Sequence, residues 1–290
     1  MGVFAGCGDG APPGGDGSET IAATVSIVPQ QYFVERIGGE HVSVDVMVLP
    51  GASPATYEPR PEQLKALSTS AAYFSIGVPF EGVWLDRIAA ANPEMVLVDT
   101  IAGIERVPMA AHEHGDEVGD EDHDHEAGAP DPHVWVSPAL VKIQAQTIAD
   151  ALIALDPKNA ADYAENLEGF LADIDALEAD LQATLTGVTD RKFLVFHPSW
   201  GYFAEDFGLE QIAIEVGGQE PSAQELAALI ALAKDENIKV VFAQAEFSTA
   251  DAETIAAELG GEVLLISPLA YDWLANLREV ATVFAEVLGR

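Results

Sequence analysis

Two histidines stand where a side chain can reach a ligand. His133 lies in the segment Asp131-Pro132-His133-Val134-Trp135, where proline stiffens the backbone and Asp131 can accept the second ring proton. His197 directly follows an apolar run that predicts a strand, and ligands of open α/β sheets bind beyond the carboxyl ends of the strands. Both imidazoles are candidate metal ligands, although each taken alone is equally well explained as a structural histidine.

Four more histidines belong to one acidic segment, the His/acid-rich loop 110–130. In it His112, His114, His123 and His125 alternate with eight carboxylates and one large apolar residue. This composition cannot pack a core, whereas alternating imidazoles and carboxylates suit weak capture of zinc or a similar divalent ion. We expect an auxiliary metal-capture loop, and the alternative is a solvated acidic loop.

The composition excludes several classes of function. The chain has 290 residues, 49% of them hydrophobic, and 13 Lys and Arg against 48 Asp and Glu give a net charge of −35. This charge repels nucleic acid and anionic lipid, and the single cysteine excludes an internal disulfide and a cysteine-based zinc cluster. An enzyme, such as a metallohydrolase that activates water on a bound metal, is an alternative class of function. The chain has no His-Glu-x-x-His pattern, nucleophile elbow or phosphate-binding loop, so we expect no enzyme.

Short β-branched runs alternate with helical segments in both halves of the chain, as in parallel sheets flanked by helices. The first predicted strand is Thr24 to Val28. Between the two sets, apolar residues from Asn159 to Leu185 follow one helical face and predict a helix of about 27 residues. The predicted fold class is α/β, with two lobes, each a mostly parallel four-stranded sheet flanked by helices, joined by one long α-helix.

Four regions follow from this pattern. They are a flexible lipoprotein-type tether at 1–20, an N-terminal α/β lobe at 21–138, a helical linker at 139–187 that includes the long spine helix, and a C-terminal α/β lobe at 188–290. Within the tether, Cys7 follows small residues and precedes a Gly-rich polar stretch, an order that resembles a lipoprotein processing site. We expect a lipid anchor at Cys7, and the alternative is a chance cysteine in a leader.

Several separate motifs together resemble the zinc and manganese solute-binding proteins of ABC transporters, of the zinc-uptake type. The likeness runs from about Thr24 to the C-terminus. In chain order, the motifs are Pro50-Gly51-Ala52-Ser53-Pro54-Ala55-Thr56-Tyr57-Glu58-Pro59, the His/acid-rich loop, Asp131-Pro132-His133-Val134-Trp135, Phe196-His197-Pro198-Ser199-Trp200-Gly201-Tyr202-Phe203 and Glu220-Pro221-Ser222-Ala223-Gln224-Glu225-Leu226. The resemblance implies a metal held in the cleft between the lobes by His133 and His197.

The chain departs from that family at two ligand positions. The family usually has a His where this chain has Ala55, and an Asp where it has Ser267. Two imidazoles leave a zinc site short of its four ligands. Three carboxylates are candidates by position to complete it, with a solvated acid or a helix cap as the alternative for each: Glu246, Asp272 and Glu58.

The function expected is that of an extracytoplasmic solute-binding protein, periplasmic or at the cell surface. It captures Zn²⁺, with Mn²⁺ as the alternative ion, and delivers it to an ABC transporter permease; we expect a monomer. One alternative keeps the receptor but changes its cargo to a metal chelate or another small solute, because two family ligands are absent. The other is a metal-binding adhesin or buffer.

Overall fold

Two parallel four-stranded sheets form the lobes of the molecule. The computed structural model describes residues 20–109, 129–215, 221–244, 246 and 249–289. The strand order is β2-β1-β3-β4 in the first sheet and β6-β5-β7-β8 in the second, so the two sheets share one topology. The strands are β1 (Ile21–Val25), β2 (Val42–Val46), β3 (Ala72–Ser75), β4 (Val96–Asp99), β5 (Lys192–Val195), β6 (Glu210–Ala213), β7 (Val240–Ala243) and β8 (Glu262–Leu265). The predicted fold class is confirmed.

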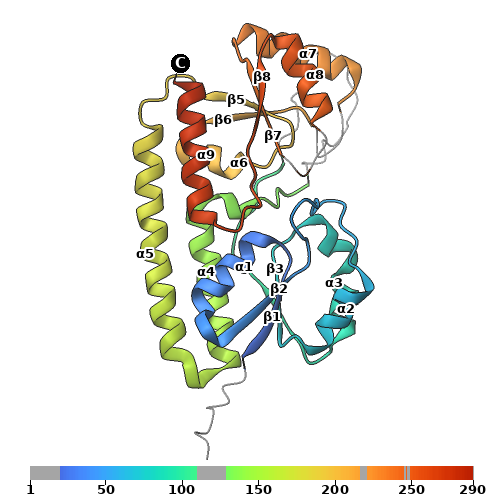
Figure 1. Ribbon diagram of the computed structural model, residues 1–290, viewed down its shortest axis with the longest axis vertical. Helices are drawn as coiled ribbons and strands as arrows, with labels where there is room; N and C mark the ends of the chain where they lie inside the picture. The colour runs from blue at the N-terminus through green and yellow to red at the C-terminus, as the bar shows by residue number, and fades with distance from the viewer. Residues whose placement is uncertain (1–19, 110–128, 216–220, 245, 247–248, 290) are drawn as a thin grey trace, which may run out of the picture.

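Helices flank both sheets (Figure 1). They are α1 (Val28–Gly38), α2 (Pro61–Ala66), α3 (Pro79–Ala91), α4 (Pro138–Leu155), α5 (Ala160–Leu185), α6 (Gly201–Phe207), α7 (Ala223–Asp235), α8 (Ala250–Leu259) and α9 (Trp273–Leu288). Helices α2 and α3 lie on the outer side of the first sheet, and α1 lies on the side that faces α4 and α5. Helix α8 packs on β7 and β8, and α7 packs against α8.

The long helix α5 runs beside both lobes (Figure 1). Its 26 residues span roughly 39 Å at 1.5 Å per residue, and it packs against α4, α9 and α1. The predicted start at Asn159 is one residue early, because Pro157–Asn159 form a 3-10 turn ahead of the helix. The apolar face is buried as predicted except for Leu171, which is half-buried.

One continuous core connects the lobes. Phe33 of α1 contacts Trp273 of α9 edge to face, with ring centroids 5.3 Å apart, and Phe284 of α9 lies 4.6 Å from Phe193 of β5. The same cluster of buried side chains extends through α4 and α5. Large rotation of one lobe against the other would expose this packed apolar surface, which favours a small tilt.

The prediction of the first strand was wrong in its bounds. The segment Thr24 to Val28 contributes only two residues to β1, which begins at Ile21. Helix α1 begins at Val28, and the Gln30 side chain accepts hydrogen bonds from the backbone N–H of Ser26 at 3.1 Å and of Ile27 at 3.3 Å. These bonds cap the helix and end the strand two residues before it.

Candidate metal centre

The structure brings His133 and His197 together. Their ring centroids are 5.2 Å apart, with the ring planes at 76°. His133 stands immediately before the 3-10 turn Val134–Val136, which leads into α4, and His197 follows β5 at the carboxyl edge of the second sheet. Both are nearly buried, with 7% and 9% of their surface exposed. One imidazole from each lobe therefore reaches the same point.

Asp131 holds the His133 ring, as the sequence suggested. One carboxylate oxygen, Oδ1, lies 2.7 Å from His133 Nδ1 and also accepts the His133 backbone N–H at 2.9 Å. Tyr202 of α6 donates its hydroxyl to the backbone carbonyl of Asp131 at 3.1 Å. The first-lobe histidine is thus fixed by Asp131, whose backbone is itself held from the second lobe.

Glu215 plays the same part for His197, and the sequence analysis missed it. Its Oε2 lies 2.5 Å from His197 Nδ1, and 8% of the residue is exposed. Glu215 follows β6 by two residues as His197 follows β5 by two, and these two strands are neighbours. Two residues at the same distance beyond the ends of adjacent parallel strands lie side by side, and this was the feature that could have identified Glu215 as a partner of His197.

Both carboxylates fix the tautomer of the imidazoles. An ionised carboxylate only accepts hydrogen bonds, so it selects the ring with its proton on Nδ1 and the lone pair on Nε2. Burial lowers the pKa of His133, an effect opposed by its hydrogen bond to Asp131 and reinforced by the nearby His197. A neutral imidazole with a directed Nε2 lone pair is the form that binds zinc.

The positions that depart from the family pattern carry no histidine or aspartate ligand. Ala55 is exposed in the loop before α2, where its backbone N–H donates to Ser53 Oγ at 3.2 Å. Ser267 follows β8, and its hydroxyl donates to Glu246 Oε1 at 3.0 Å. The second position is therefore linked to a carboxylate from the segment after β7.

The three candidate carboxylates differ in their surroundings. Glu58 is exposed. Asp272 is exposed as well and acts as the N-cap of α9, accepting the Ala275 backbone N–H at 3.1 Å. Glu246 is half-buried. Within the described ranges, no three His, Cys, Asp or Glu side chains already lie close enough together to hold a metal ion.

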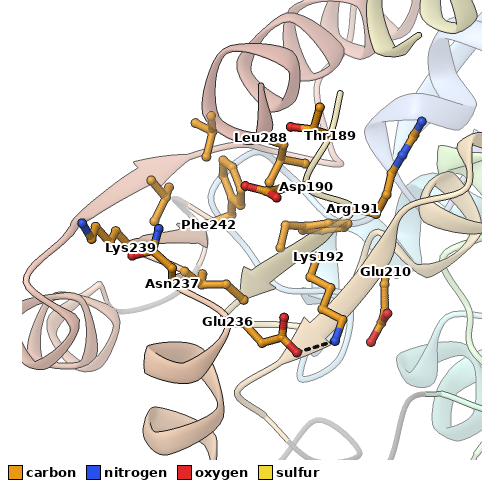
Figure 2. A pocket seen from close by; sticks show the side chains of 14 residues that line it. Thr189, Asp190, Arg191, Lys192, Glu210, Glu236, Asn237, Lys239, Phe242 and Leu288 are labelled. Carbon is orange, nitrogen blue, oxygen red and sulfur yellow. Dashed lines mark hydrogen bonds and ion pairs between the residues drawn. The ribbon is translucent and has the colours of Figure 1, made fainter. Parts of the chain in front are cut away.

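A cavity of about 520 Å³ lies at the opposite edge of the second sheet (Figure 2). Its lining includes the first residues of β5, β6 and β7, which are Lys192, Glu210 and Val240. Lys192 pairs with Glu236 at 2.6 Å. Because His197 lies at the carboxyl ends of these strands, this cavity is separate from the candidate metal centre.

Several sequence-predicted residues lie outside the described residues. They are Cys7 with most of the tether, and His112, His114, His123 and His125 of the His/acid-rich loop. Among the helices that the structure does describe, none is both long and apolar enough to cross a membrane.

A family model described as the periplasmic component A of the zinc-uptake complex matches residues 23–287. The chain belongs to this family. The high-affinity zinc uptake system protein ZnuA of Bacillus subtilis (strain 168) is 27% identical over 273 residues, covering 92% of this chain and 85% of that protein. A crystal structure of a zinc-bound ZnuA deletion mutant is 47% identical, with a TM-score of 0.86 over 94% of this chain and 99% of the other.

A similar fold is found in the laminin-binding protein of Streptococcus agalactiae, described as a bifunctional protein with adhesin and metal-transporting activity. It is 23% identical, with a TM-score of 0.79 over 93% of this chain and 100% of the other. At that identity the likeness supports the fold alone.

Proposed function

We propose that this member of the zinc-uptake family binds Zn²⁺ through His133 and His197, one from each lobe, and delivers it to the permease of an ABC transporter. The observation that carries the proposal is the pair of buried imidazoles, 5.2 Å apart, each held at Nδ1 by a buried carboxylate. The family consists of solute-binding proteins of ABC transporters, not of enzymes, which sets the metallohydrolase alternative aside.

The divided ligands suggest how binding is sensed. An ion held by His133 and His197 connects the segment before α4 to the end of β5, so it favours the arrangement of the lobes in which both rings face it. The continuous core and α5 keep the accompanying movement small. Imidazole ligands favour zinc over manganese, which prefers oxygen ligands, so Mn²⁺ is the weaker cargo.

Calorimetric titration of the chelator-stripped protein with Zn²⁺ and Mn²⁺ tests the proposal. The unaltered protein should bind Zn²⁺ tightly, and His133→Ala and His197→Ala should each abolish that site. His41→Ala is the matched control, because this histidine pairs with Asp162 away from the centre, and it should leave affinity unchanged. No affinity tighter than about 10 μM for either ion contradicts metal uptake.

The departures at Ala55 and Ser267 favour one second candidate, a receptor of the same architecture whose cargo is a metal chelate. Titration of the same protein with a zinc complex and with the free ion separates the two candidates. Binding of the complex but not of free Zn²⁺ would favour the chelate receptor. The reverse result supports capture of the bare ion.

We also propose that the protein is an extracytoplasmic monomer, lipid-anchored through Cys7. The sequence around Cys7 supports the anchor, and a periplasmic family supports the location. Mass spectrometry of the protein from intact cells should find Cys7 modified, and an unmodified cysteine contradicts the anchor.

The His/acid-rich loop would serve as an auxiliary capture segment, so deleting residues 110–130 should leave the tight site intact.

A further inference from the structure

We infer that Glu246 supplies the third protein ligand of the metal and that Ser267 positions it. This rests on the proposed function, because it names a ligand of the same site. The family pattern leads one to expect a histidine at Ala55 and an aspartate at Ser267 as ligands. In this chain, Glu246, which follows a different strand, would take their place.

Ser267 is held so that its hydroxyl can orient Glu246. Its Oγ donates to Glu246 Oε1 at 3.0 Å and accepts the Leu269 backbone N–H at 3.1 Å. Its carbonyl accepts a hydrogen bond from Asn276 Nδ2 of α9 at 2.8 Å. With both its hydroxyl and its carbonyl engaged, Ser267 presents a fixed donor to one oxygen of the carboxylate.

The other oxygen of Glu246 points to a cation. Oε2 is shielded from solvent and receives no hydrogen bond from the residues that the structure describes. A buried carboxylate oxygen without a donor is costly, since it has lost its hydration without compensation. Coordination of a divalent ion would compensate that loss.

Two chains of contacts connect the Ser267–Glu246 pair to the segments that carry the two histidines. On the second lobe, Gln244, two residues before Glu246, donates to the Ser199 hydroxyl, and the Ser199 backbone N–H donates to the His197 carbonyl at 2.8 Å. This follows from topology, because β7 lies between β5, which ends before His197, and β8, which ends before Ser267.

The second chain of contacts comes from the first lobe. Trp135 Nε1 donates to the carbonyl of Pro268 at 2.8 Å, and the Trp135 ring lies 5.1 Å from the His133 ring. Pro268 is the residue after Ser267. The Ser267–Glu246 pair is therefore connected both to the segment that carries His133 and to the segment that carries His197.

The resulting donor set is two imidazoles and one carboxylate, which leaves the fourth position of a tetrahedral zinc site to water. In the described part of the molecule these three side chains do not yet form a ligand cluster. Glu246 must therefore turn toward the imidazoles when the ion enters, with Oε1 starting from its hydrogen bond to Ser267.

Competition of the protein with a chromophoric chelator for Zn²⁺ tests this inference. Glu246→Gln keeps the shape and removes the charge; it should weaken zinc binding at least about tenfold. Glu262→Gln is the matched control, with the same change of charge at the opposite end of β8, and should leave affinity unchanged. Ser267→Ala should weaken binding by less than Glu246→Gln, and Ser267→Thr, which restores a hydroxyl, should recover it.

Two further readouts separate a ligand from a structural residue. The visible absorption spectrum of the Co²⁺-loaded protein should change in Glu246→Gln but not in Glu262→Gln, whereas the unfolding midpoint of the metal-free protein should be the same in both variants. If Glu246→Gln binds Zn²⁺ like the unaltered protein while His133→Ala and His197→Ala lose the site, the inference about Glu246 is overturned and the proposed function stands. Absence of tight binding by the unaltered protein overturns the proposed function itself.

Discussion

Replacing Asp131 by Asn tests how the first-lobe histidine is prepared for metal. Asp131 is 3% exposed and uses one oxygen to accept both the His133 ring N–H, at 2.7 Å, and its backbone N–H, at 2.9 Å. Asparagine preserves the shape and one acceptor oxygen but removes the charge. The ring becomes more positive when Nε2 binds a cation, so the charged acceptor at Nδ1 matters most in the metal-bound state.

The magnitude follows from that difference. Loss of a carboxylate behind a metal-bound histidine costs about 10–100-fold in affinity. This corresponds to about 1.4–2.7 kcal/mol of binding free energy. We expect Asp131→Asn to weaken Zn²⁺ binding by this amount while the protein stays folded, because the shape of the buried side chain is conserved.

The assay is chelator competition on the unaltered protein, Asp131→Asn and a control. Asp206→Asn is the control: Asp206 accepts a hydrogen bond from Ser137 Oγ at 2.6 Å, close to the start of α4, so the same charge is removed from a carboxylate that bonds a hydroxyl rather than an imidazole. It should bind Zn²⁺ normally. Equal affinity in Asp131→Asn and the unaltered protein would refute the assignment of Asp131 as the residue that orients His133.

Three other predictions concern stability and motion. Burial raises the pKa of Glu81 above its ordinary 4.5, so the folded state keeps a proton that the unfolded chain loses, and the free energy of unfolding falls as the pH rises above 4.5. Urea unfolding of Glu81→Gln should lack this pH-dependent part of the stability. The same pH dependence in Glu81→Gln and the unaltered protein contradicts the prediction. Gln144 is fully buried and its amide has no hydrogen bond among the described residues, so Gln144→Met should raise the free energy of unfolding by about 1–3 kcal/mol, whereas exposed Gln146→Met should change it little and a destabilised Gln144→Met refutes the reasoning. X-ray scattering of the metal-free and zinc-loaded protein should show only a small change in radius of gyration, because α5 and the shared core resist hinge motion; a large change contradicts this.

The sequence predicted the parts of the molecule that depend on local pattern. Alternation of apolar runs with helical segments identified two parallel sheets, and the apolar face of α5 was recognisable from its spacing alone. The bounds of β1 were missed because a local side-chain cap, in which Gln30 accepts the backbone N–H groups of Ser26 and Ile27, decides where the strand ends. The β-branched residues continue past the end of the strand, so their pattern alone does not show where the cap ends it.

The candidate site was predictable only in part. His133, His197 and the role of Asp131 followed from motifs in which the residues are close in sequence. Glu215 and the link between Ser267 and Glu246 join segments that meet only when neighbouring strands align. The matching positions of Glu215 and His197 after their strands become informative only once the strand order is known, and no local pattern reveals the link between Ser267 and Glu246. Which of several acids faces a site depends on strand order, and strand order is a property of the fold.

Anomalous diffraction at the zinc edge from a crystal grown with Zn²⁺ tests the central claim most directly, because it identifies both the element and its ligands. We predict one strong peak between the Nε2 atoms of His133 and His197, with Glu246 as the third protein ligand. A peak on the histidines of the His/acid-rich loop alone, with none between His133 and His197, would contradict the claim that these two residues hold the transported ion.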